Sequence, residues 1–126
     1  DTSIENVPNY PQYINFKWED ACPIDSFNLT IGYAASAPTS FELQTRQADG
    51  TWKTVMTANE TWSSDFESKN YTFDEETTSW MRVAILAANK GQKIEYNGGI
   101  EGNASRVVRI AGGYYSIAEI ELNESR

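Results

Sequence analysis

The sequence contains no histidine and a single cysteine, Cys22. Without histidine the chain has no Ser-His-Asp triad, no Cys-His nucleophile pair and no histidine metal site. One cysteine cannot form an intramolecular disulfide. Because Cys22 is followed by Pro23 in a hydrophobic stretch, we expect a small core residue rather than a reactive thiol.

The sequence also lacks a run of basic residues and a long run of apolar ones. Its 10 basic and 18 acidic residues give a net charge of −8. With no lysine or arginine cluster along the chain, nucleic acid and anionic membranes are not expected partners. No stretch approaches the roughly 20 apolar residues of a transmembrane helix, and no signal peptide is visible, as in a mature or excised domain.

What is present is a hydrophobic fraction of 40% and an aromatic fraction of 13% in 126 residues. That length fits a single domain, residues 1–126, which buries roughly two-thirds of its unfolded surface without a disulfide or metal. Short β-branched and aromatic runs alternate with Gly, Pro, Asn and Asp, which predicts an all-β domain, an antiparallel β-sandwich. The expected strands are 13–18, 24–31, 41–46, 52–56, 71–73, 80–86, 106–110 and 117–122.

Several details of this pattern can be predicted. Gly50 supplies the positive φ of a hairpin turn between strands 41–46 and 52–56. Alternation predicts which side chains share a face. In 24–31 the more apolar set is Asp25, Phe27, Leu29 and Ile31, and in 80–86 Met81, Val83 and Ile85 share one face opposite Trp80. In the last strand we expect Ala118, Ile120 and Leu122 to face inward and Ile117 outward. Strand tryptophans are usually buried, so we also expect Trp18, Trp52 and Trp80 in the core.

Four segments of the chain resemble the discoidin family, also called coagulation factor V/VIII type C domains, and in particular family 32 carbohydrate-binding modules. They are residues 11–16 with 24–27, 41–45 with 49–52, 80–83, and 116–122 (Ser-Ile-Ala-Glu-Ile-Glu-Leu). The second and the last are the more specific, and together the segments span roughly residues 11–122. The resemblance implies a galactose-binding-like jelly roll.

Three features depart from the family pattern. The family's usual opening segment, near a ligand loop and often a structural calcium, is absent, so the chain is expected either to start inside the domain or to have a shortened entry. The paired cysteines of animal members are missing. Both Arg82 and the segment 106–110 resemble the strand that carries the family's structural arginine, and the sequence does not decide between them.

The resemblance also indicates where a sugar would bind. An aromatic ring stacks on a pyranose, and loop polar groups read its hydroxyls. Related modules often place the stacking ring where Tyr114 and Tyr115 stand, one of which we expect to be structural. Residues 32–38 stand where those modules carry an arginine and an asparagine, which leaves Tyr33 as the sizeable candidate and makes galactose specificity doubtful.

Two further loops contribute candidate ligand contacts. The long connection 89–103 carries Glu95, Tyr96 and Asn97, and a loop of this length in a compact domain is often functional. Trp62 lies in a polar stretch, where it is either an exposed binding platform or folded beneath the loop.

Catalysis and metal binding have weaker support. The carboxylates come as neighbours, Glu19 with Asp20 and residues 74–76, as solvated loop charges do, so no catalytic residues are assigned. These runs could ligate calcium, which needs only oxygen ligands, but neither has the spacing of a dedicated loop. No cofactor is predicted, and a bound calcium stays an open alternative.

The sequence therefore predicts a non-enzymatic carbohydrate-binding module that attaches a secreted or surface protein to a glycan. Five N-glycosylation sequons occur, at Asn28, Asn59, Asn70, Asn103 and Asn123. They indicate either a glycosylated extracellular surface or a bacterial secreted protein rich in Asn, Ser and Thr in which none is glycosylated. Both interpretations favour an extracellular location. Two alternatives remain: an interaction domain that packs against a catalytic partner and binds no sugar, and a small carboxylate hydrolase.

Overall fold

The computed structural model describes residues 11–89, 100–102, 107–111 and 117–125. In these residues every pair of neighbouring strands is antiparallel. Apart from the single residue Asn89, the one helical element among them is a short 3-10 helix. None of the described residues forms a helix long and apolar enough to cross a membrane. The elements are β1 (Gln12–Ile31), η1 (Ala34–Ser36), β2 (Pro38–Arg46), β3 (Trp52–Asn59), β4 (Ser68–Ala88), β5 (Ile100–Gly102), β6 (Val107–Ala111) and β7 (Ile117–Glu124).

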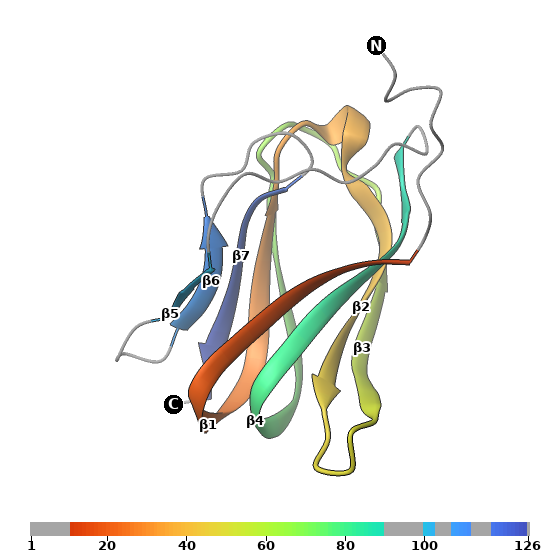
Figure 1. Ribbon diagram of the computed structural model, residues 1–126. Helices are drawn as coiled ribbons and strands as arrows, with labels where there is room; N and C mark the ends of the chain where they lie inside the picture. Colours follow the sequence, from red (N-terminus) through yellow and green to blue (C-terminus); the bar gives the residue numbers. More distant parts are fainter. Residues whose placement is uncertain (1–10, 90–99, 103–106, 112–116, 126) are drawn as a thin grey trace.

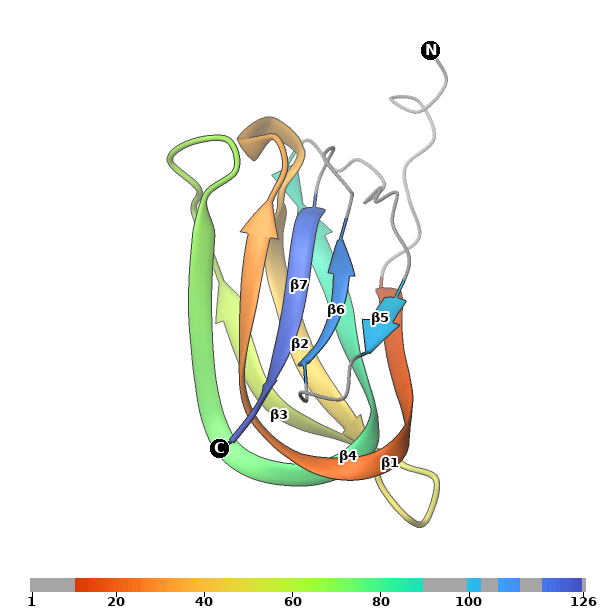
Figure 2. The ribbon, with the colours of Figure 1, turned by 90° about the vertical axis from the view of Figure 1, so that its left-hand side faces the viewer.

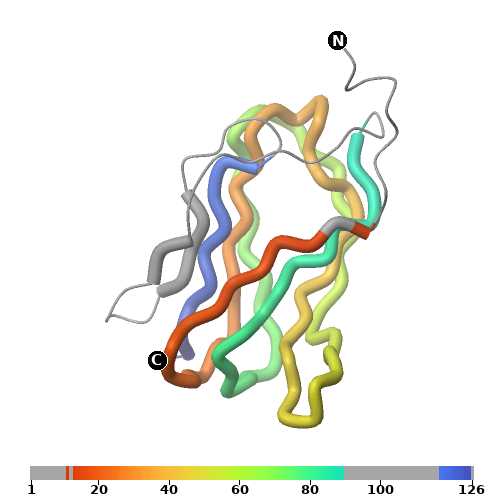
Figure 3. The backbone as a smooth tube through the Cα atoms, in the orientation of Figure 1, coloured from red at the N-terminus to blue at the C-terminus, as the bar shows by residue number. Residues whose placement is uncertain are grey.

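The long strands β1 and β4 both bend sharply at one end of the molecule (Figures 1 and 2). They pair with each other on both sides of the bend, but β7 pairs only with the second half of β1, and β2 only with the second half of β4. The sheet order β3-β2-β4-β1-β7-β6-β5 is thereby folded into two facing layers (Figure 3). We call β3, β2, the second half of β4 and the first half of β1 the first layer, and the remaining strands the second layer.

This arrangement confirms the predicted antiparallel β-sandwich and corrects its strand boundaries. Residues 13–18 and 24–31 belong to one strand, and so do 71–73 and 80–86. Pairing continues close to the bend through Cys22↔Thr78 and Pro23↔Thr77. The sequence suggested breaks there because acidic and proline residues are also typical of turns. The expected irregular connection 89–103 contains the short strand β5.

The core lies between the two layers and is built from alternating apolar side chains. Phe16, Phe41 and Met81 of the first layer are fully buried against Phe27 and Leu29 of the second. Tyr71 stacks on Phe27 at 5.0 Å between ring centroids and meets Phe41 edge-on at 5.7 Å. Cys22 is half-buried and packs against this cluster, as predicted for a small core residue.

Two β-bulges change which residues face inward. A register shift between Ile24 and Ser26 buries Ile24 completely and leaves Asp25 half-buried, so the alternation that grouped Asp25 with Phe27 does not hold at these two residues. A second shift opposite Thr30/Ile31 buries Ile117, which was expected outside, and leaves Ala118 half-buried. The extra residue in a bulge reverses the alternation beyond it.

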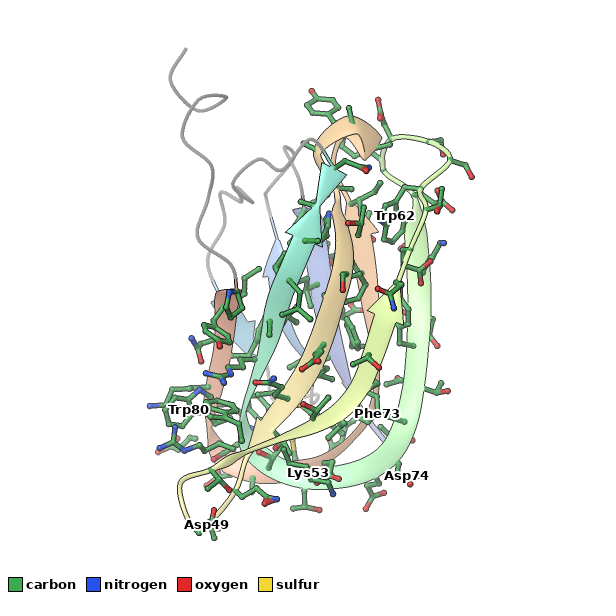
Figure 4. All side chains as sticks on the ribbon, turned by 90° about the vertical axis from the view of Figure 1, so that its right-hand side faces the viewer. Asp49, Lys53, Trp62, Phe73, Asp74 and Trp80 are labelled. Atoms are coloured by element: carbon green, nitrogen blue, oxygen red, sulfur yellow. The ribbon has the colours of Figure 1, made fainter. Side chains whose placement is uncertain are left out.

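The tryptophan prediction is partly wrong. Trp18 is half-buried and packs against the core. Trp52 and Trp80 instead lie on the outer surface of the first layer, where their rings meet edge to face at 5.2 Å. Alternation explains this, because Met81 occupies the inner face and its neighbour Trp80 must therefore point outward (Figure 4).

The β2–β3 hairpin agrees with the sequence. Gly50 has φ +89°, a conformation that residues with a Cβ rarely adopt. The carboxylate of Asp49 accepts hydrogen bonds from the hydroxyl and the backbone N–H of Thr51. These two bonds lower the pKa of Asp49 and hold the turn closed.

Candidate functional site

Two loops lie side by side at the end of the sandwich opposite the bends (Figures 1 and 2). We call residues 32–37 loop A and residues 60–67 loop B. The N–H of Phe66 donates to the carbonyl of Gly32 at 2.8 Å, and the N–H of Ala34 donates to the carboxylate of Asp65 at 2.9 Å. Loop A is also held from the residue that follows β4, because the Asn89 side chain donates to the carbonyl of Ala34 at 2.8 Å. The loops form one hydrogen-bonded unit.

This unit exposes a pair of aromatic rings. Tyr33 on loop A is 42% exposed and Phe66 on loop B is 52% exposed. Their ring centroids lie 5.8 Å apart with an interplanar angle of 61°, an edge-to-face arrangement. Neighbouring rings that stay accessible on a braced support can stack against the apolar face of a ligand.

The backbone of Phe66 is unusual. Its φ is +61°, the one positive value among the described residues other than glycine. A bulky side chain in this left-handed region is a conformational outlier that costs of the order of 1–3 kcal/mol. Such a conformation persists because loop B is held by other bonds, including those from the N–H groups of Ser63 and Ser64 to the Glu67 carboxylate.

Trp62 is folded beneath loop B, one of the two positions that the sequence allowed (Figure 4). It is 7% exposed, and its indole N–H donates to the carbonyl of Pro38 at 2.7 Å. The ammonium of Lys69 lies 4.7 Å from the centre of the ring. Trp62 is therefore a support for the loop pair and lacks the exposed face that a binding platform needs.

A half-buried polar cluster of Glu60, Lys69 and Tyr71 lies beside Trp62. The Glu60 carboxylate accepts hydrogen bonds from the ammonium of Lys69 and from the hydroxyl of Tyr71, both at 2.7 Å. Burial raises the pKa of Glu60, but these two bonds outweigh it and leave the pKa below its usual value. Burial and the Glu60 carboxylate raise the pKa of Tyr71, which therefore stays protonated as a donor.

The remaining predicted contacts lie outside the described residues: Glu95, Tyr96, Asn97, Tyr114 and Tyr115. The structure brings Tyr33 together with Phe66, which the sequence reasoning did not single out. Its signal was weak, because a phenylalanine in the polar stretch 59–70 could equally have folded inward as Trp62 does.

No group of three or more potential metal ligands occurs among the described residues. Of the acidic runs considered for calcium, Glu76 forms a salt bridge with Lys53 at 2.8 Å, and Glu75 accepts a hydrogen bond from Ser125. A cavity of about 440 Å³ near Lys53 and Asp74 is lined by both signs of charge and by Phe73 (Figure 4).

No protein-family model matches the sequence, and a search of curated proteins finds no match. The fold, in contrast, is shared with solved carbohydrate-binding modules. The CBM32-5 module of a family 89 protein from Clostridium perfringens, in complex with GalNAc-β-1,3-galactose, superposes with a TM-score of 0.57 and 13% identity. The alignment covers 92% of this chain and 68% of that module.

Two further modules give the same result. The family 32 module of EndoD from Streptococcus pneumoniae has a TM-score of 0.57 and 11% identity, covering 93% of this chain and 72% of its own. The family 32 module of NanJ from C. perfringens, in complex with galactose, has a TM-score of 0.52 and 16% identity, covering 93% and 70%. At these identities the comparisons establish the galactose-binding-like fold.

Proposed function

We propose that the chain is a non-catalytic carbohydrate-binding module whose site is the end of the sandwich formed by loops A and B. The observation that carries this proposal is the exposed pair of Tyr33 and Phe66 on mutually hydrogen-bonded loops. Rings held in advance lose little conformational freedom when a sugar stacks on them. Strain at Phe66 supports the proposal, since outlying backbone conformations cluster at binding sites.

Polar groups next to the rings supply hydroxyl recognition. Asp65 is exposed beside Phe66, and the bond from Ala34 holds one of its oxygens in place. A fixed carboxylate can accept hydrogen bonds from the hydroxyls of a ring stacked nearby. Glu95, Tyr96, Asn97, Tyr114 and Tyr115 remain proposed contacts of the same site.

The fold, as well as the site, supports the proposed ligand class. The neighbours named above include complexes with galactose and with GalNAc-β-1,3-galactose. Loop A carries small residues around Tyr33, so the proposal is for a pyranose-containing glycan and not for galactose in particular. An open, polar site of this kind gains little from burial, so its affinity for a short sugar should be modest.

We further infer an extracellular setting, in which the module attaches a larger protein to glycan. Of the sequons in the described residues, Asn59 and Asn70 are exposed. The side-chain amides of Asn28, Asn70 and Asn123 donate hydrogen bonds to Glu121, Asn28 and Ser26. Asn59 is accordingly the sequon at which a glycan would disturb least.

A glycan array followed by titration calorimetry tests the proposal. The folded wild-type chain should retain at least one glycan, and Tyr33→Ala and Phe66→Ala should each weaken it by about tenfold, since one stacking contact contributes roughly 1–1.5 kcal/mol. Tyr13→Ala is the matched control, because Tyr13 is equally exposed, at 45%, but lies on the first layer. Its affinity for a neutral glycan should not change.

Phe66→Gly separates binding from stability. Glycine accepts the positive φ, so this variant should be as stable as the wild type or up to about 1 kcal/mol more stable while still losing affinity. If no glycan binds under folded conditions, or if Tyr33→Ala and Phe66→Ala weaken association with a partner protein instead, the interaction-domain alternative is favoured.

A further inference from the structure

A ladder of alternating cations and aromatic rings crosses the outer surface of the first layer. Arg82 lies between Tyr13 and Trp52, at 3.9 and 4.0 Å from the ring centres. Next along the ladder, Arg46 lies 5.3 Å from Trp52 and 4.7 Å from Trp80. Lys17 closes it at 4.1 Å from Trp80. We call these six residues the ladder.

The strand register explains why the ladder forms. Lys17 is opposite Trp80 in the β1–β4 pair, and Arg46 is opposite Trp52 in the β2–β3 pair. The cations therefore stand on β2, β4 and β1, three neighbouring strands spaced roughly 4.8 Å apart. Figure 4 shows Trp80 projecting outward at the lower edge of this layer.

The charge of the ladder contrasts with the rest of the chain. In a protein of net charge −8, its three cations form no ion pair with any described residue, whereas the other two described lysines do. Two partial compensations exist. Arg82 donates to Gln44 at 2.7 Å and Gln44 donates in turn to Glu42 at 2.9 Å, and the positive charge of Arg46 is attracted by the nearby Asp49 carboxylate, whose pKa it helps to lower. The ladder is thus a positive strip on an acidic molecule.

The ladder offers charged N–H groups rather than open ring faces. Cations already cover faces of Trp52 and Trp80, which leaves the edges of the guanidinium groups and the Lys17 ammonium to donate outward. Such donors bind carboxylates and sulfates strongly and directionally. The strip matches a partner with anions at repeated intervals.

We propose that the ladder is a second binding surface, distinct from loops A and B, that takes an acidic polysaccharide through its carboxylate or sulfate groups. A protein partner usually anchors an aromatic or aliphatic side chain in a desolvated pocket. The cavity near Lys53 and Asp74 is not lined by ladder residues. A stiff polyanion needs only the row of fixed donors.

The test measures binding of the full chain to three polymers at 50 mM NaCl: polygalacturonate, which carries carboxylates, dextran sulfate, which carries sulfates, and neutral dextran. The first two arms distinguish the anion, and neutral dextran should not bind. Raising NaCl to 500 mM should weaken binding markedly, because exposed charges are screened. Arg46→Gln and Lys17→Gln should each weaken binding about tenfold.

Lys53→Gln is the matched control. It removes the same charge from β3 next to Trp52, but its ammonium is paired with Glu76, so affinity should stay within about twofold. Arg82→Lys, which keeps the charge, should bind better than Arg82→Gln at similar thermal stability. Tyr33→Ala and Phe66→Ala should not affect polyanion binding, so failure of either proposal can be recognised separately.

Four results would overturn the proposal. One is no retention of either polyanion by the folded wild type at 50 mM NaCl. Another is an equal loss of affinity in Lys53→Gln and Arg46→Gln, which would indicate net charge alone. The third is binding of poly-glutamate or a DNA oligonucleotide while neither polysaccharide binds. Variants that lose stability but bind normally when folded would make the ladder purely structural.

Discussion

Thr45 places a hydroxyl in the core of the sandwich. The residue is 2% exposed, and its oxygen has no hydrogen-bond partner among the described residues. A buried hydroxyl without a partner costs of the order of 1–3 kcal/mol in desolvation. Thr45→Val, which keeps the shape, should therefore raise the free energy of unfolding by about 0.5–1 kcal/mol in urea titrations. A decrease of that size would mean that the hydroxyl is satisfied.

Glu60 makes stability depend on pH. Because its pKa is lower in the folded state than its usual value, its contribution is fully present above the usual glutamate pKa and is lost as pH falls through the folded-state pKa. Glu60→Gln should cost up to about 1 kcal/mol at pH 7, and the difference from wild type should shrink towards pH 3. Urea unfolding at several pH values measures this.

A matched carboxylate serves as the control for Glu60. Glu76→Gln removes an ion pair whose lysine side chain is 51% exposed, against 29% for Lys69. Its effect at pH 7 should be smaller, because exposed ion pairs contribute little. Equal losses in the two variants would contradict the role assigned to the Glu60 cluster.

At the scale of the element, the bulge near the start of β7 determines which of two neighbouring residues, Ile117 or Ala118, contributes to the core. It buries Ile117 completely and leaves Ala118 half-buried. Ile117→Ala should lower the free energy of unfolding by about 2–4 kcal/mol, while Ala118→Ser should change it by less than about 0.5 kcal/mol. Urea denaturation of both variants checks this, and the reverse order would restore the simple alternation.

The elements also show how far the sequence could predict the fold. Alternation correctly grouped Phe27 with Leu29, and Met81 with Val83 and Ile85, on faces that are buried, because these residues lie in regular pairing. It failed at Ile24 and Ile117, because a bulge leaves no local signature in the side chains. The bends were not foreseen, since Glu19, Asp20 and Pro23 favour turns as readily as an outward-curving strand.

The candidate site was predictable only in part. Tyr33 was predicted because it is the one large side chain in a segment where the modules that the chain resembles carry ligand contacts. Phe66 and Trp62 are both aromatic residues in loop B, and the choice of which one is buried depends on the carbonyl of Pro38, which comes from another strand. Tertiary contacts of this kind cannot be read from the local sequence.

At the scale of the whole molecule, the two layers cannot separate without breaking strands. β1 and β4 each run through both layers, so the sandwich of fewer than 150 residues should unfold in a single transition. Tryptophan fluorescence and far-UV circular dichroism should give coincident curves in urea. Separate midpoints for the two signals would show that one layer melts alone.

The same scale explains the ladder. No two of Lys17, Arg46 and Arg82 are close in the sequence, which therefore showed no basic cluster. Pairing of β1, β4 and β2 brings them onto one surface. The order of charges along the sequence shows whether basic residues are neighbours in the chain. It does not show a basic patch whose members come from different strands.

The central position of β1 has a consequence for how the protein is made. Its second half pairs with β7, and the contact between Asn28 and Glu121 joins residues 93 positions apart. At roughly 5–20 residues per second, a ribosome needs about 5–20 s to add the missing partner. Throughout that interval Phe27 and Leu29 stand on an incomplete sheet, so yield during synthesis should depend on a chaperone that covers this edge until the last strand arrives.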